Sequence, residues 1–129
     1  MARSCKRPLA GFTLIELLVV LAALALLLGL AVPRYVEHVD RAREIVLKQN
    51  LRAMRDAIDK FSADRGRYPL ELTELAKERY LREVPPDPVT DSVLTWTVVP
   101  PPSGAQGQVY DVHSGATGNS RDRSPYAAW

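Results

Sequence analysis

An apolar run over residues 12–32 constrains this chain more than any other feature of its sequence. As an α-helix, its 21 residues would extend about 31 Å, which matches the hydrocarbon core of a bilayer. A cleaved secretory signal also follows a basic leader, but its apolar stretch is about 7 to 15 residues long and ends in a small-residue site. The sequence that follows Gly29 is a poor site of that kind. We therefore expect one transmembrane helix that is retained.

Glu16 is the only charged residue within this run. A lone carboxylate in the hydrocarbon core costs about 3 kcal/mol unless another group compensates its charge. The carboxylate of an ordinary membrane anchor would instead reach toward the lipid headgroups. These two interpretations differ in whether Glu16 has a partner.

The amino-terminal sequence resembles a known processing signal. A leader with Arg3, Lys6 and Arg7 meets the apolar run at Gly11 without a polar spacer, and the acidic residue is the fifth after that glycine. The string GFTLIE at residues 11–16, followed by LLVV, is similar to the class III signal of type IV pilins and of the pseudopilins of type II secretion.

This resemblance implies processing followed by assembly. Prepilin peptidase would cut between Gly11 and Phe12 on the cytoplasmic face and methylate the new amino terminus of Phe12. Glu16 would then pair with the Phe12 amine of a neighbouring subunit. The pairing makes physical sense, because cleavage creates an ammonium in a low-dielectric setting and Glu16 supplies an opposite charge about one helical turn away. Neutralisation of the two charges would favour a homopolymer.

Composition limits the remaining possibilities. The net charge of +2 includes the three basic residues of the leader, and without them 14 basic residues face 15 acidic ones. This balance implies no polybasic surface for nucleic acid on the mature chain. The sole cysteine, Cys5, would also leave with the leader, so the mature chain would contain no disulfide.

The orientation in the membrane cannot be assigned from charge. Basic residues lie on both sides of the apolar run, so the positive-inside rule does not decide between the two orientations. The family resemblance implies a cytoplasmic leader. It therefore implies a single-pass protein of the bacterial inner membrane with its carboxyl-terminal domain in the periplasm.

The helix is predicted to continue beyond the membrane as an amphipathic segment over residues 33–65. An apolar stripe recurs at steps of three and four residues. Its members are Val39, Ala42, Val46, Leu47, Leu51, Met54, Ile58 and Phe61. Four oppositely charged pairs are spaced four apart on the other face, and each would add a few tenths of a kcal/mol. They are Glu37 with Arg41, Glu44 with Lys48, Arg52 with Asp56, and Asp56 with Lys60. Helix is expected from Phe12 to about Ala63.

Gly29 and Pro33 mark a weak point in this long helix. Pro33 cannot donate a hydrogen bond to the Gly29 carbonyl, and its ring crowds the preceding turn. One interpretation is an ordinary proline kink at the membrane exit. The other is a segment that loosens when the subunit enters the filament.

Residues 66–129 are predicted to form an α/β globular part. Gly66 and Tyr68 before a proline end the long helix. A short helix is expected over residues 71–80, with strands over residues 93–99 and 108–113 in an antiparallel sheet of two to four strands. The fold class is thus α+β and pilin-like, with residues 1–11 a cleaved leader and residues 12–32 the transmembrane and filament-core helix.

Several features of the globular part resemble the major pseudopilins of type II secretion. They include Tyr68-Pro69, Pro86-Asp87-Pro88, Trp96, the segment YDVHSG at residues 110–115, and Tyr126 with Trp129. The resemblance implies a structural subunit that polymerises through its amino-terminal helix and drives folded proteins across the outer membrane. It also implies partners: minor pseudopilins, an inner-membrane assembly platform with its ATPase, and an outer-membrane secretin. The alternative within the superfamily is a type IV pilin, or a minor or competence pseudopilin with a binding role.

One departure from the family concerns calcium. Major pseudopilins commonly bind calcium in the loop after the second of these strands, through carbonyl oxygens and several acidic side chains. The corresponding loop here contains Ser114, Gly115 and one carboxylate, Asp122, between two arginines. We therefore expect no cofactor and no metal, and an Asp122 that makes a surface ion pair. The alternative is a calcium site in this loop that includes Ser114, Gly115 and Asp122.

Two other function classes, an enzyme and a plain membrane anchor, make different predictions. Asp111, His113 and Ser114 are the residue types of a catalytic triad, but on a strand Ser114 points away from the other two. No glycine-rich phosphate loop or metal-ligand cluster accompanies them, so no enzyme is predicted. A plain single-span anchor that never assembles would be monomeric in detergent and would keep its leader.

Overall fold

The computed structural model describes residue 2 and residues 8–129. Cys5 and the basic residues Arg3, Lys6 and Arg7 of the expected leader lie outside the described residues. The chain divides into two compact units, residues 1–38 and residues 39–129.

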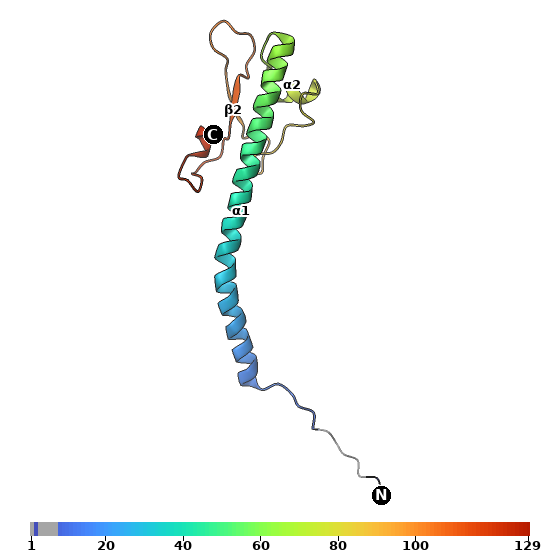
Figure 1. Ribbon diagram of the computed structural model, residues 1–129, viewed down its shortest axis with the longest axis vertical. Helices are drawn as coiled ribbons and strands as arrows, with labels where there is room; N and C mark the ends of the chain where they lie inside the picture. The colour runs from blue at the N-terminus through green and yellow to red at the C-terminus, as the bar shows by residue number, and fades with distance from the viewer. Residues whose placement is uncertain (1, 3–7) are drawn as a thin grey trace. The chain divides into compact units, whose positions relative to one another are not determined.

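The long helix α1 extends over Leu14–Arg65, 52 residues, close to the predicted segment (Figure 1). It begins two residues later than expected because Thr13 caps it: the Thr13 hydroxyl accepts a hydrogen bond from the Glu16 backbone N–H at 3.2 Å. It ends at Arg65, and Gly66 follows with a φ of +68°, which suits a residue without a side chain. The helix continues through Pro33 without a break.

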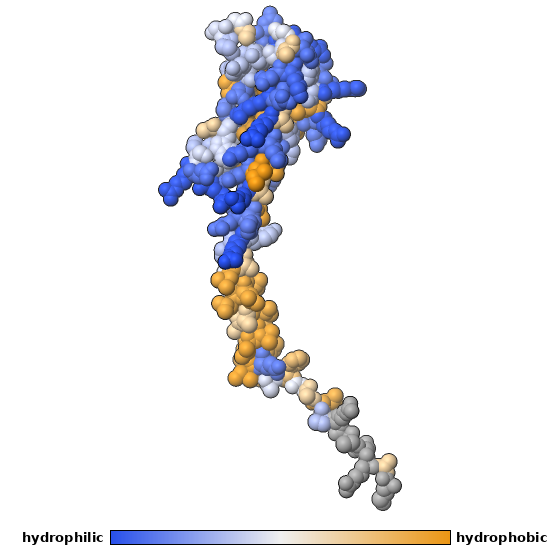
Figure 2. Space-filling view, in the orientation of Figure 1, coloured by the Kyte–Doolittle hydropathy of each residue, from blue (hydrophilic) through white to orange (hydrophobic). Residues whose placement is uncertain are grey.

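In residues 14–32 the apolar side chains of α1 are exposed, and they gather as an apolar surface in Figure 2. A window of 18 residues in this helix reaches a mean hydropathy of 2.8, enough for a candidate membrane span. An exposed apolar surface of this kind is stable in lipid or against other subunits, but not in water.

The amphipathic part of α1 forms one side of the core of the second unit. Leu47, Leu51, Met54, Ile58 and Phe61 are buried, as the periodicity predicted. The stripe begins later than expected, because Ala42 and Val46 are exposed and only the segment from Leu47 onward is covered. Apolar residues from the rest of the unit complete the core: Leu75, Trp96, Val109 and Val112.

The second helix is shorter than predicted. It is α2 (Leu72–Lys77), six residues rather than ten. Arg79 has a φ of +64°, outside helical geometry. The backbone N–H groups of Tyr80 and Leu81 both donate to the Leu75 carbonyl, at 2.8 and 3.1 Å. These bonds close the helix with a turn and bring Tyr80 back against Phe61.

The sheet has two strands in the described part of the chain, β1 (Thr97–Val99) and β2 (Asp111–His113), paired antiparallel. Figure 1 shows β2 beside the carboxyl-terminal half of α1. Both strands are shorter than predicted. Gln108 and Val109 donate their backbone N–H groups to the Pro69 carbonyl and so leave the ladder. Residues 93–96, which were predicted to belong to the first strand, lie outside β1. The backbone of Gly115 lies against Thr95 so closely that a Cβ atom on Gly115 would be 1.9 Å from the Thr95 carbonyl oxygen.

Candidate assembly site

The amino-terminal end of α1 brings together the residues that the sequence singled out for processing and assembly. Gly11 and Phe12 precede the helix, and Phe12 is 90% exposed. Glu16 lies in the first helical turn. Phe12, Thr13, Glu16, Leu17 and Val20 line a hollow of about 470 Å³ together with Leu14.

Thr13 and Glu16 have the spacing of a capping box. The Thr13 hydroxyl satisfies the Glu16 N–H, and the Thr13 carbonyl accepts from Leu17 at 3.2 Å. Within the described residues, the Glu16 carboxylate accepts no hydrogen bond from the Thr13 backbone N–H or from any other group. The cap therefore fixes the start of the helix and leaves the carboxylate of Glu16 available.

A carboxylate in this position is favourable for the helix itself. The first turn of an α-helix carries unpaired N–H groups and the positive end of the helix dipole. Glu16 complements this positive end, whereas a positive charge at residue 12 would be repelled by it. The geometry thus suits a carboxylate that attracts a cation placed just before the helix.

Gly29 and Pro33 both lie within α1 and not in the hollow. A Cβ atom on Gly29 would meet nothing within 4 Å outside the helix's own backbone. Gly29 is therefore not required by packing within its own unit. Whether this segment loosens in a filament stays a prediction.

The loop after β2 was the candidate calcium site, and its residues face different partners. The buried Ser114 hydroxyl donates to the Asp87 carboxylate, and Gly115 contacts the backbone of Thr95. Asp122 is exposed and lines a hollow with Lys48 and Arg52.

This donor set does not fit calcium. The cation takes six to eight oxygen ligands. The described residues contain no cluster of three or more acidic, histidine or cysteine side chains. The expected ion pair of Asp122 is also not found, because no basic group of the described chain lies within 4.0 Å of its carboxylate. The prediction that Asp122 makes a surface ion pair was wrong.

A carboxylate from α1 closes this loop instead, which sequence reasoning missed. Glu44 Oε1 accepts a hydrogen bond from the Arg121 backbone N–H at 2.8 Å and another from the Tyr126 hydroxyl at 3.3 Å. Burial, followed by the charge of Glu44, raises the pKa of Tyr126, so the hydroxyl remains a donor at neutral pH. Lys48 lies 4.5 Å from the centre of the Trp129 ring, a cation–π distance.

The catalytic interpretation gains no support from the geometry. His113 Nε2 lies 3.6 Å from Asp111 Oδ2, and Arg55 Nε binds the other oxygen of Asp111 at 2.8 Å. Ser114 faces the opposite side and bonds to Asp87. A nucleophile must lie within hydrogen-bond reach of its base, and Ser114 instead donates to a buried carboxylate.

Comparisons with known proteins identify the family. Residues 7–32 match the model of the prokaryotic N-terminal methylation motif. The type II secretion system core protein G of Pseudomonas aeruginosa PAO1 is 31% identical over 99 residues, which cover 64% of this chain and 70% of that protein. The chain belongs to the family of type II secretion system core protein G.

Two further relatives lie in the same superfamily. Core protein G of Aeromonas hydrophila is 34% identical over 64 residues, half of this chain and 45% of that protein. The type IV major pilin protein PilA of Myxococcus xanthus is 36% identical over 58 residues, but these span only 26% of the pilin. No solved structure gives a significant match. The long amino-terminal helix, short helix and small antiparallel sheet agree with the α+β, pilin-like fold of this core protein G family.

Proposed function

We propose that this chain is the structural subunit of a type II secretion pseudopilus. Prepilin peptidase cuts between Gly11 and Phe12 and methylates the Phe12 amine. The processed subunits then polymerise through α1 into a periplasmic filament that drives folded proteins across the outer membrane. The protein performs no chemistry in this scheme.

The observation that carries the proposal is the position of Glu16. It is the single charge of the apolar run, lies in the first turn of α1, and shares a hollow with Phe12. Cleavage at Gly11 would place an ammonium on Phe12, beside the positive end of the helix dipole. That ammonium is unfavourable there unless a carboxylate neutralises it.

Pairing between neighbouring subunits satisfies both charges. An unpaired Glu16 in the hydrocarbon core costs about 3 kcal/mol. A filament that brings Glu16 of one subunit to the Phe12 amine of the next offsets this cost, together with that of the ammonium. The exposed apolar side chains of residues 14–32 would then contact other subunits instead of lipid.

The parts of the chain have distinct roles in this proposal. Residues 1–11 are a cleaved leader, residues 12–32 a membrane anchor that becomes the filament core, residues 33–65 its amphipathic continuation, and residues 66–129 the periplasmic part. An inner-membrane platform and its ATPase add subunits at the base. Minor pseudopilins occupy the tip, and a secretin provides the outer-membrane channel.

Fibre counts test the role of Glu16. Cells that overproduce the chain with its assembly machinery are imaged by electron microscopy for the wild type, Glu16→Gln and Glu37→Gln. Glu16→Gln keeps the side-chain shape and removes the charge, so we expect at least a tenfold loss of fibres. Glu37→Gln removes a charge from the same helix outside the apolar run and should assemble normally. Equal fibre numbers in all three would refute the proposed pairing.

The match to a type IV major pilin supports one alternative, a surface pilin. Deletion of the gene separates the two functions. A pseudopilin mutant should accumulate secreted proteins in the periplasm and lose them from the medium. Loss of long surface fibres with an unchanged set of secreted proteins would identify a pilin.

A further inference from the structure

The part of α1 directly after the apolar run carries two opposite charges in a fixed order. Arg34 and Glu37 are three residues apart on one side of the helix, about 60° from each other, and both are exposed. Within the described residues, neither takes part in an ion pair, although Glu37 was predicted to pair with Arg41. Tyr35 is 71% exposed. Residues 34–37 are called the exit segment below.

A bilayer around residues 14–32 would place the exit segment among the lipid headgroups. A bilayer is about 40 to 45 Å thick with its headgroups and about 30 Å thick without them, so each headgroup layer measures about 5 to 7.5 Å. In a helix, Arg34 is about 3 Å beyond Val32 and Glu37 is about 7.5 Å beyond it. Arg34 therefore lies at the inner side of this layer and Glu37 at its outer side. An exposed tyrosine is favourable at the same depth, because its ring is apolar and its hydroxyl is polar.

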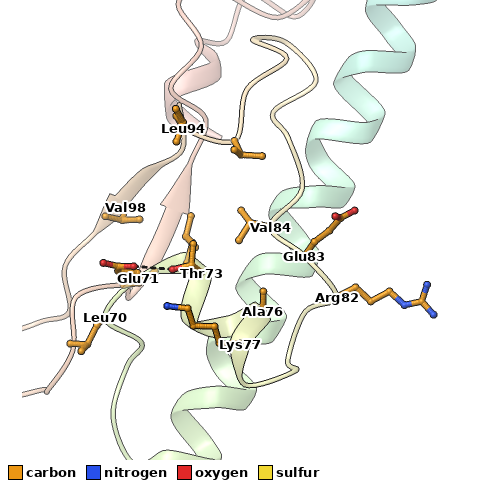
Figure 3. Close-up of a pocket in the computed structure, with 13 residues that line it drawn as sticks. Leu70, Glu71, Thr73, Ala76, Lys77, Arg82, Glu83, Val84, Leu94 and Val98 are labelled. Atoms are coloured by element: carbon orange, nitrogen blue, oxygen red, sulfur yellow. Dashed lines mark hydrogen bonds between the residues drawn. The ribbon is translucent and has the colours of Figure 1, made fainter.

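Another exposed apolar surface, a groove of about 590 Å³ beside α2, has no comparable constraint (Figure 3). Two acidic and two basic side chains line it: Glu71, Glu83, Lys77 and Arg82. Their charges favour no particular partner. The exit segment differs from this groove because the apolar run next to it determines its surroundings.

We propose that the exit segment binds the headgroup of a zwitterionic phospholipid, with the Arg34 guanidinium on the phosphate and the Glu37 carboxylate on the ammonium. This inference rests on the membrane-anchored state in the proposed function. In such a headgroup the phosphate is attached near the acyl chains and the ammonium is at the free end. The order of charges along the helix is thus the order of the opposite charges in the lipid. A guanidinium suits the phosphate, because two of its N–H groups can donate to two phosphate oxygens.

The two residues have different roles in this site. Phosphatidylglycerol also offers a phosphate to Arg34, but it has no ammonium, and its negative charge is repelled by Glu37. Phosphatidylethanolamine satisfies both side chains. Arg34 therefore provides affinity for phospholipids in general, and Glu37 provides the preference for a lipid that carries an ammonium.

The headgroup contact belongs to the subunit in the membrane. It is broken when the subunit leaves the bilayer for the filament, so its removal would weaken the hold of the membrane on the subunit. Loss of the contact should therefore not lower the number of fibres. Glu37→Gln should change the lipid preference and still assemble normally.

Lipid competition on the full-length chain tests the site. The chain in detergent is mixed with equal amounts of phosphatidylethanolamine and phosphatidylglycerol that have the same acyl chains. Native mass spectrometry then measures the ratio of the two single-lipid adducts. For the wild type we expect about a threefold preference for phosphatidylethanolamine, the size of effect of one exposed charge pair. Glu37→Gln should abolish the preference without loss of phosphatidylglycerol adducts, and Arg34→Gln should lower both adducts.

A charge swap separates the order of the charges from their number. The double variant Arg34→Glu with Glu37→Arg keeps the net charge and reverses the order, so the preference for phosphatidylethanolamine should be lost. Arg43→Gln and Asp59→Asn are the matched controls, since both residues are exposed on α1 several turns farther from the apolar run. Both controls should behave like the wild type.

Several results would overturn the headgroup site. They are a wild type that binds the two lipids equally, a swap variant that keeps the wild-type preference, and controls that lose it as the exit-segment variants do. A wild type that prefers phosphatidylglycerol would also overturn it, because Arg34 alone would then account for the binding.

Membrane retention distinguishes this failure from failure of the proposed function. A chain that stays in membranes during an alkaline carbonate wash, but shows no lipid preference, would overturn only the headgroup site. A chain that the wash releases would refute the anchored state, and the headgroup site and the proposed function would then fail together.

Discussion

Replacement of Glu44 by alanine should loosen the carboxyl-terminal loop. The carboxylate accepts one short hydrogen bond from the Arg121 backbone and a longer one from the Tyr126 hydroxyl. A hydrogen bond to a charged group contributes about 1.5 to 3 kcal/mol when it is buried. The Arg121 bond is exposed and the Tyr126 bond is long, so we expect a total loss of about 1.5 kcal/mol. For a domain of 60 to 100 residues, this corresponds to a fall in melting temperature of about 6 to 12 °C.

The assay must report on the loop rather than on the helix in detergent. Trp129 lies against Lys48 and Trp96 is buried in the core, so tryptophan fluorescence follows the unfolding of the second unit. The full-length chain is melted in detergent, with calcium and with a chelator. Asp59→Ala is the matched control, since Asp59 is an exposed carboxylate on the same helix.

The two calcium conditions separate the possible explanations. If Glu44 closes the loop without a metal, the wild type should melt at the same temperature with calcium and with the chelator. Glu44→Ala should melt at a lower temperature than the wild type under both conditions. A Glu44→Ala variant as stable as Asp59→Ala would refute the role of Glu44. A wild type that calcium stabilises by several degrees would refute our conclusion that this donor set does not fit the cation.

Three further perturbations probe the second unit. Asp87→Ala should lower the free energy of unfolding, measured by chemical denaturation, by about 2 to 4 kcal/mol, because the fully buried Asp87 carboxylate accepts hydrogen bonds from the Val89 N–H and the Ser114 hydroxyl. Asp87→Asn should lower it less. An equal loss in the two variants would contradict a hydrogen-bonding role for Asp87. Phe61 is fully buried, so Phe61→Ala should lower the free energy of unfolding by about 3 to 5 kcal/mol. A loss below 1 kcal/mol would show that residue 61 is not in a packed core. The hydrogen bond from Arg67 to Glu74, followed by that from the Leu70 N–H, lowers the pKa of the Glu74 carboxyl. The stabilising effect of a lowered pKa is present above the unfolded pKa of about 4.3 and is lost as pH falls through the folded value. Glu74→Gln should therefore destabilise the protein at pH 7, and its difference from the wild type should shrink below about pH 4; a difference that does not change with pH would contradict this linkage.

Strong periodicity made much of the fold predictable from the sequence. The long apolar run and the stripe from Leu47 to Phe61 predicted α1 within two residues at each end. Gly66 correctly predicted where α1 ends, because the left-handed backbone at that position favours glycine. Local residue chemistry was sufficient for these features.

Features that depend on tertiary contacts were predicted less well. Of the four ion pairs expected on α1, only Lys60 with Asp56 forms, at 2.8 Å. Glu44 instead bonds to a loop about 80 residues later, and Lys48 lies over Trp129. Each such surface pair contributes little, so a tertiary partner easily replaces it. The length of the second strand was overestimated for a similar reason: the backbone N–H groups of Gln108 and Val109 donate hydrogen bonds to the Pro69 carbonyl instead of to a neighbouring strand.

The prediction of the assembly site depends on a local signal in the sequence. Gly11, Phe12 and Glu16 lie within six consecutive residues, and Phe12 and Glu16 line the same hollow. The exposure of Leu94 and Val46 was not predicted, because the sequence suggested a strand over residues 93–99 and an apolar stripe that includes Val46. Leu94 lies in the bend before β1, and the buried residues of α1 begin at Leu47.

The mass of the subunit taken from assembled fibres tests the central claim most directly. Our account predicts a chain that begins at Phe12 and carries one added methyl group on its amine, so that a charged amino terminus is present for Glu16 of a neighbour. Fibres built from chains that still begin at Met1 would contradict it, because no Phe12 amine would then exist to pair with Glu16.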